Sequence, residues 1–133
     1  DLITNRYIDF IRVHLSQIGG LTPARKLAML AEHFGVRSAW HGPSDVSPVG
    51  HACNAHLDLA IHNFGIQEGP RFSERLQEVF PGCPEIRNGY LHVNDKPGFG
   101  MDLDERLAAK YPLPEDPGFW TPIRRRDGTA VRP

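Results

Sequence analysis

No uninterrupted apolar run in this chain approaches the roughly 20 residues that a membrane-spanning helix needs. Only two of the 133 residues are cysteines, Cys53 and Cys83, which is too few for a disulfide framework. The 15 basic and 16 acidic residues leave a net charge of −1, so the chain has no surplus charge to attract nucleic acid or an acidic membrane. No signal peptide is visible. The sequence therefore predicts a protein of the reducing cytoplasm, with neither nucleic acid nor membrane as a partner.

The composition that remains is that of a folded domain. Hydrophobic residues make up 40% of the chain and charged residues 23%, which is typical of globular proteins. A chain of this length can bury a sizeable core. The first residue is Asp1 and not methionine, and residues 1–3 read like the end of a helix. We therefore expect a fragment of a longer protein.

Strand-like and helical segments alternate in the first half of the chain. β-branched and aromatic residues predict strands over 8–15, 36–41 and 64–68. Helices are expected between them, at 22–34 and from 47 to 63, and each begins with a hydroxyl N-cap followed by proline. This order is typical of a parallel α/β fold. Three parallel strands cannot close a barrel, so the pattern predicts one part of a larger barrel.

The pattern changes after Gly69. A short helix is expected within 72–80, and Asn88-Gly89 predicts a type I′ hairpin over 85–93. A last short helix is expected over 104–111, capped by Asp102 or Asp104. From Pro112 the chain is rich in proline and charge, and we interpret the arginine run 124–126 as a solvated or interface stretch.

Three polar residues follow the predicted strands at nearly equal intervals. They are Arg12, His41 and Glu68, separated by 29 and 27 residues, which is about one strand, one helix and two loops. In a β/α barrel, residues at the C-terminal ends of successive strands meet at one mouth, where active sites are built. The spacing therefore offers an arginine, a histidine and a carboxylate to one pocket. The alternative is that they are ordinary polar residues on solvated loops.

Two longer motifs resemble a known family. The sequence HGPSDVSP at 41–48, followed by NFGIQE at 63–68, resembles the mannonate dehydratase branch of the enolase superfamily, of the mandelate racemase/muconate lactonizing enzyme type. Residues 88–91, 96–102 and 126–129 share that resemblance, which covers essentially the whole chain. It implies the C-terminal part of a (β/α)7β TIM-type barrel, with the last three βα units at 1–69. Residues 70–133 would form a C-terminal segment that packs on the capping domain.

The resemblance also implies a chemistry, the dehydration of a sugar acid such as D-gluconate or D-mannonate to a 2-keto-3-deoxy acid. A base removes the proton next to the carboxylate, and the 3-hydroxyl leaves as water. Mg²⁺ and positioned hydrogen-bond donors make that proton acidic enough by stabilising the enediolate. The acidic metal ligands and the acid/base pair of the family correspond to residues upstream of Asp1, so we expect no metal ligand in this chain. The implied partners are the sugar acid, the rest of the barrel with its capping domain, and further copies in a homo-oligomer.

The resemblance assigns roles to four residues of this chain. Arg12, Asp45 and Glu68 would bind substrate, whereas His41 would both bind substrate and act in catalysis. In relatives such as mandelate racemase, an aspartate in the place of Arg12 partners the histidine to make a base. Because an arginine stands there in this chain, we expect His41 to orient hydroxyls or to help one leave.

Two other functions fit the sequence less closely. One is a non-catalytic sensing or regulatory protein that kept the barrel, since a fold does not determine a function. The other is a small metal-binding module, although helical geometry puts its histidines 51 and 56 on different faces. Its members would be His51, Cys53, His56 and His62. We interpret Cys53 as a small buried hydrophobe, and His14 and His92 as strand-packing residues. Trp40 and Trp120 could line a pocket, but burial alone explains them at least as well.

Overall fold

The strands of the first half are parallel, as the βα pattern predicted. The computed structural model describes residues 1–69, 71–112, 123–124, 126–127 and 130–131. In it, β1 (Phe10–Ile11) pairs with β2 (Arg37–Ser38) in parallel register. Hydrogen bonds from Ala39 N to Ile11 O (2.9 Å) and from His41 N to Val13 O (3.0 Å) continue the pairing beyond both strands. Within 8–15, Ile11 and Leu15 are buried while Phe10 and Arg12 are exposed, which fits the alternating faces of a strand.

The third predicted strand is much shorter than expected. Residues 64–68 join the sheet through one parallel bridge, from Phe64 to Ser38. The amides of Gly65 and Ile66 both donate to the Ser38 carbonyl at 3.1 Å, so the segment turns away from the sheet. The prediction of full strands over 8–15, 36–41 and 64–68 was therefore too long, since apolar composition does not show how many ladder bonds a segment makes.

Helix α1 (Leu21–His33) begins two residues before the predicted first residue, Pro23, and Thr22 is not its N-cap. Gly20 takes that position at φ 96, with no side-chain capping bond. A capping side chain bonds the second or third amide of a helix. Pro23 occupies the third position and has no N–H, so one of the two amides that a capping side chain could bond is absent. Gly35, at φ 67, ends the helix as predicted.

Helix α2 (Pro48–Ala60) begins as predicted, because the Ser47 hydroxyl accepts a hydrogen bond from Gly50 N at 3.3 Å. The helix ends at Ala60 and not at Asn63. The side chain of Asn63 is instead buried and donates to two carbonyl oxygens, those of Ala28 at 3.0 Å and Val36 at 2.9 Å. This side chain thereby ties α1 to the start of β2.

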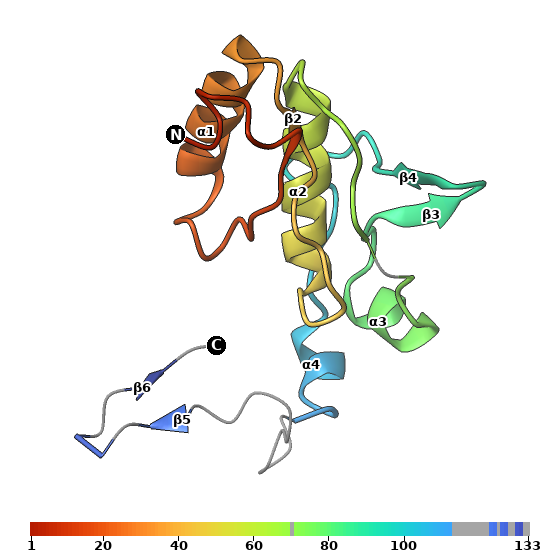
Figure 1. The fold of residues 1–133 in the computed structure, drawn as a ribbon. Coiled ribbons are helices and arrows are strands. Elements are labelled where there is room, and N and C mark those ends of the chain that lie inside the picture. Colours follow the sequence, from red (N-terminus) through yellow and green to blue (C-terminus); the bar gives the residue numbers. More distant parts are fainter. Residues whose placement is uncertain (70, 113–122, 125, 128–129, 132–133) are drawn as a thin grey trace.

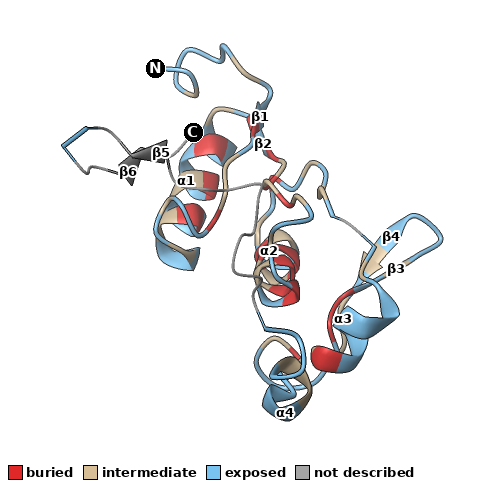
Figure 2. Ribbon diagram, turned by 90° about the horizontal axis from the view of Figure 1, so that it is seen from below, coloured by how far each residue is buried: buried red, intermediate tan, exposed pale blue. Residues whose placement is uncertain are grey.

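The core lies between the sheet and the two helices, whose buried residues line one side of each (Figure 2). Its fully or almost fully buried members are Ile11, Leu15, Ala24, Ala28, Ala31, Val36, Trp40 and Leu57. Three alanines form the buried face of α1, and their small side chains let the helix lie close to the strands. This packing holds the C-terminal ends of β1 and β2 in fixed positions.

The second half follows α2 in Figure 1 as short elements. These are α3 (Glu74–Val79), β3 (Glu85–Arg87), β4 (Tyr90–His92) and α4 (Glu105–Ala108). The predicted hairpin is confirmed, with Asn88 at φ 52 and Gly89 at φ 81 between its strands. The predicted cap is also confirmed for Asp104, whose carboxylate accepts from Leu107 N at 2.8 Å.

A second antiparallel pair, β5 (Ile123–Arg124) with β6 (Ala130–Val131), was not predicted. Its first strand includes Arg124, the first residue of the arginine run that we interpreted as a solvated or interface stretch. The interpretations of Trp120, Arg125 and positions 128–129 lie outside the described residues. No helix among the residues described is both long and apolar enough to cross a membrane.

Candidate functional site

Three of the four predicted site residues meet where the parallel strands end. Arg12 Nη2 lies 3.0 Å from Glu68 Oε1 and 2.9 Å from Oε2. His41 Nε2 lies 3.9 Å from Glu68 Oε2, and Gly42 N donates to the same oxygen at 3.1 Å. The convergence expected from the 29- and 27-residue steps is therefore present in the structure. The roles assigned to these residues stay predictions.

The fourth predicted residue, Asp45, does not join this cluster. It is exposed in the loop between β2 and α2. Within the described part of the chain, no hydrogen bond or ion pair links it to Arg12, His41 or Glu68. The structure therefore does not bring Asp45 together with the other three residues.

The surroundings of Glu68 favour its ionised form. Partial burial on its own would raise the pKa of the carboxyl, but Gly42 N–H, the Arg12 guanidinium and His41 together hold that pKa below its ordinary value. The side chains of Arg12 and Glu68 are 56% and 41% exposed, so solvent screens their attraction. Glu68 is thus a hydrogen-bond acceptor near neutral pH.

His41 lies beside a second histidine that the sequence analysis assigned only to packing. The rings of His14 and His41 meet edge to face, with centroids 5.4 Å apart. Both rings line a cavity of about 240 Å³, together with Cys53, Asn54 and residues of the adjacent loops and helix. Strand alternation could have indicated this, because it puts Arg12 and His14 on one face.

Cys53 is unsuited to nucleophilic chemistry in this cavity. Burial raises the pKa of its thiol above the ordinary value, which favours the protonated and unreactive form. Its side chain is half-buried on α2. The interpretation of Cys53 as a small hydrophobe agrees with this environment.

The loops that carry His41 and Glu68 are packed tightly together. A Cβ atom on Gly42 would collide with the backbone oxygen of Glu68, so only glycine fits at this close approach. The Gln67 side chain donates to the carbonyl oxygens of Trp40, at 3.3 Å, and of Glu68. Asn54 of α2 donates to the carbonyl oxygen of His41 at 3.4 Å. These contacts fix the backbone that presents the two side chains.

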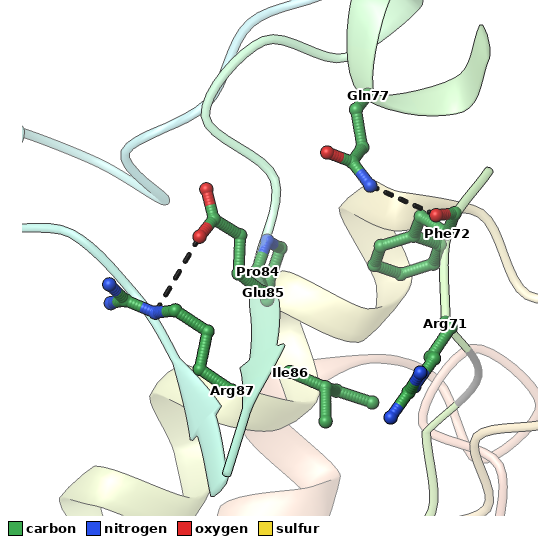
Figure 3. Close-up of a pocket in the computed structure, with 7 residues that line it drawn as sticks. All are labelled: Arg71, Phe72, Gln77, Pro84, Glu85, Ile86 and Arg87. Carbon is green, nitrogen blue, oxygen red and sulfur yellow. Dashed lines mark hydrogen bonds and ion pairs between the residues drawn. The ribbon is translucent and has the colours of Figure 1, made fainter. Parts of the chain in front are cut away.

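A different cavity, of about 270 Å³, lies between β3 and the segment that precedes α3 (Figure 3). It is lined by Arg71, Phe72, Gln77, Pro84, Glu85, Ile86 and Arg87, and by none of the four predicted site residues. Its polar side chains are exposed, and two of them form the Arg87–Glu85 ion pair at 3.6 Å. With no buried polar group to orient a ligand, this cavity is a weaker candidate than the strand-end cluster.

The described residues contain no group of three or more histidine, cysteine, aspartate or glutamate side chains placed to hold a metal ion. The alternative of a metal-binding module on α2 finds no support in its histidines. His51 Nε2 lies 3.2 Å from the Pro43 carbonyl oxygen, and the His56 ring packs on Phe99 with centroids 5.5 Å apart.

Comparison with known proteins places this geometry in context. Residues 1–107 match the sequence profile of the enolase C-terminal domain-like family. A D-galactonate dehydratase family member of Salmonella enteritidis PT4 is 60% identical over 132 residues, and one of Musicola paradisiaca is 58% identical over 132 residues. Both alignments cover 99% of this chain and 32% of the relative. The chain therefore spans about a third of the length of these relatives.

One solved structure covers the same region. It is that of an enolase from Pantoea ananatis with bound D-gluconate and Mg, which is 55% identical and has a TM-score of 0.85. The match covers 99% of this chain and 32% of that one. The similarity therefore extends across the strand-end cluster.

Proposed function

Because this chain belongs to the enolase C-terminal domain-like family, we propose that the protein that carries it is a Mg²⁺-dependent sugar-acid dehydratase. The proposed substrate is D-gluconate, D-mannonate or both, and the product is the 2-keto-3-deoxy acid. One observation carries the proposal. An arginine, a histidine and a carboxylate converge in a chain that is 55% identical to an enolase crystallised with D-gluconate and Mg.

The described residues do not form a site for the metal ion. In this proposal the ligands of Mg²⁺ and the base that removes the proton belong to the remainder of the protein, of which the chain spans about a third. The residues of this chain bind and orient the substrate.

Arg12 suits an anionic ligand. Its two contacts with Glu68 both use Nη2, and in the described part of the chain Nε and Nη1 make no hydrogen bond. These free N–H groups can donate to a carboxylate or to hydroxyl oxygens of the substrate. A guanidinium stays protonated near neutral pH, so Arg12 stabilises negative charge but is a poor base.

His41 and Glu68 can share one substrate hydroxyl. Their nearest atoms, Nε2 and Oε2, are 3.9 Å apart, which is too long for a direct hydrogen bond. A hydroxyl oxygen about 2.8 Å from each atom would bridge them. The hydroxyl would keep its own proton and donate a hydrogen bond to Glu68, while His41 would transfer a proton to the hydroxyl oxygen as the carbon–oxygen bond breaks and water leaves. In this proposal Asp45 also binds substrate, from the loop between β2 and α2.

The open edge of the sheet supports the placement of the chain in a larger barrel. Phe64 and Ile66 lie on the segment that ends this side of the sheet, and they are 46% and 63% exposed. Another strand would cover them. We propose that residues 1–69 complete a barrel and that residues 70–133 pack on a capping domain. We further propose that the protein is a cytoplasmic homo-oligomer.

The test uses His41→Asn in the full-length protein, with the exposed residue His62 changed in the same way as a control. Each variant is incubated with D-gluconate or D-mannonate and Mg²⁺ in deuterated water. We expect His41→Asn to lower keto-acid formation by about 100-fold, while deuterium still exchanges next to the carboxylate. The His62→Asn control should behave like the unmodified protein.

Two results would contradict the proposal. If exchange vanishes in His41→Asn while substrate binding is intact, His41 is the base and the assigned role is wrong. If the unmodified, metal-loaded protein converts neither sugar acid, the dehydratase proposal fails and the sensing or regulatory function becomes the better one.

A further inference from the structure

His51 is a buried polar side chain that the proposed chemistry does not use. It lies in the first turn of α2 and is only 1% exposed. Its Nε2 is 3.2 Å from the Pro43 carbonyl oxygen, and its ring meets Phe72 edge to face with centroids 5.3 Å apart. One side chain thus contacts the loop before α2 and the segment after Glu68.

The His51 ring fills the space where these two segments meet. A Cβ atom built on Gly42 would lie 3.0 Å from His51 Cε1, and one built on Gly69 would lie 4.0 Å from Nδ1. Gly42 and Gly69 therefore both pass close to the same imidazole. A much smaller side chain at position 51 would leave these segments without this packing surface.

The position of Gly42 matters for the candidate site because its amide donates to Glu68 Oε2 at 3.1 Å. His51 thus contacts Pro43, which follows Gly42 in the chain, and the Gly42 amide contacts the Glu68 carboxylate. Burial lowers the pKa of His51, so the neutral ring is favoured, and its Nε2–H can donate to the Pro43 carbonyl. The backbone amide of Val46 also donates to that carbonyl at 3.1 Å, which closes the loop on itself.

We propose that His51 is a positioning residue that holds loop 41–46 so that the Gly42 amide fixes the Glu68 carboxylate beside Arg12 and His41. The catalytic consequence rests on the proposed dehydratase function. The contacts themselves are independent of it, so they allow a test that does not need turnover.

An ordinary core histidine would fill space and nothing more. Its replacement would lower the stability of the whole fold without acting on one pair of loops. A positioning residue predicts a local change in segments 41–47 and 64–69, and a larger effect when the N–H donor is removed than when it is kept.

The test compares two variants of the full-length protein. His51→Phe keeps a ring but has no donor for the Pro43 carbonyl, whereas His51→Gln keeps an N–H at a similar reach. His56→Phe is the matched control, because His56 is on the same helix and its ring contacts Phe99 and not Pro43 or Phe72. Hydrogen–deuterium exchange of peptides 41–47 and 64–69, the melting temperature, and kcat and KM for D-gluconate are measured for each.

For His51→Phe we expect exchange in both peptides to be about 10-fold faster and kcat/KM to fall about 10- to 100-fold. His51→Gln should restore both to within about 3-fold of the unmodified protein. The control should leave both peptides unchanged. Should His51→Phe fail to fold, His51→Asn takes its place, since its shorter amide cannot reach the Pro43 carbonyl and should also speed exchange.

The outcomes separate this inference from the proposed function. Unchanged exchange in both peptides of His51→Phe, or equal effects of Phe and Gln, would overturn the positioning role even if the protein is a dehydratase. Faster local exchange in His51→Phe, rescued by Gln, supports the role even if no sugar acid is converted by any form of the protein.

Discussion

Replacement of Asp58 by asparagine should stabilise the protein at alkaline pH and have less effect at acidic pH. Asp58 lies on α2, with Oδ1 3.5 Å from the Ser38 hydroxyl and Oδ2 buried without a hydrogen-bond partner. Burial raises the pKa of this carboxyl from 3.8 to about 7, although the Ser38 and Trp40 side chains partly oppose the rise. The indole nitrogen of Trp40 makes no hydrogen bond in the described part of the chain, so Trp40 lies near the Asp58 carboxyl without bonding it.

The direction of the pH dependence follows from which state, folded or unfolded, binds the Asp58 proton more tightly. With the folded pKa at about 7 and the unfolded value at 3.8, the folded state binds a proton that the unfolded state has released. This contribution to stability is complete below the unfolded pKa and is lost as the pH rises through about 7. Asparagine resembles the protonated carboxyl and does not ionise.

The size of the effect can be bounded. The difference between 3.8 and about 7 corresponds to roughly 4 kcal/mol at full effect, at about 1.4 kcal/mol per pH unit. Part of this change falls below pH 5, and Asp58 is only partly buried. We therefore expect the stabilisation by asparagine to be about 1–2 kcal/mol larger at pH 8 than at pH 5.

The assay is urea unfolding of the full-length protein and the Asp58→Asn variant at pH 5, 6, 7 and 8. The difference between the two proteins at each pH cancels the titration of all other groups. Asp95→Asn, at an exposed loop position, is the control and should give a difference near zero at every pH. A difference for Asp58→Asn that stays constant from pH 5 to pH 8 would refute the argument, because the carboxyl would then ionise alike in both states.

Two further substitutions test the backbone that supports the site. Gly42→Ala should abolish most of the proposed activity and lower stability by about 1–3 kcal/mol, because its Cβ would collide with the Glu68 carbonyl oxygen. Ser44→Ala, exposed in the same loop, is its control, and equal activity of the two variants would contradict the prediction. Asn63→Ala removes two buried hydrogen bonds and should lower the free energy of unfolding by about 2–3 kcal/mol in urea titrations. A loss no larger than that of an exposed asparagine, such as Asn5→Ala, would show that these bonds contribute little.

Local signals in the sequence predicted the elements whose geometry depends on a few adjacent residues. Ser47 before Pro48 defines the start of α2, since one hydroxyl and one proline ring are enough to begin a helix. Asn88-Gly89 defines the hairpin, since both residues accept positive φ. The convergence of Arg12, His41 and Glu68 was predictable for a different reason, because the βα repeat places successive strand ends at one edge.

Contacts between distant segments could not be predicted in the same way. Asn63 reads as the end of a helix, yet its side chain bonds carbonyl oxygens 35 and 27 residues away. In the sequence, the cysteine and histidine near His51 indicate only a candidate metal ligand. Its actual partners, Pro43 and Phe72, are set by how two loops cross, and no spacing of residue types encodes that crossing.

The Arg12–Glu68 ion pair would affect how an anionic substrate binds at the proposed site. An ion pair with side chains 56% and 41% exposed contributes about 0–1 kcal/mol, so a ligand can share or displace it at little cost. The pair holds the guanidinium at the strand ends while Gly42 anchors the carboxylate from the other side. In the proposed site, Arg12 is therefore oriented and Glu68 ionised before a substrate carboxylate or hydroxyl binds. Under the proposed function the pair would act in orientation more than in stability, and loss of the hydrogen bond from Gly42 should weaken substrate binding more than it destabilises the fold.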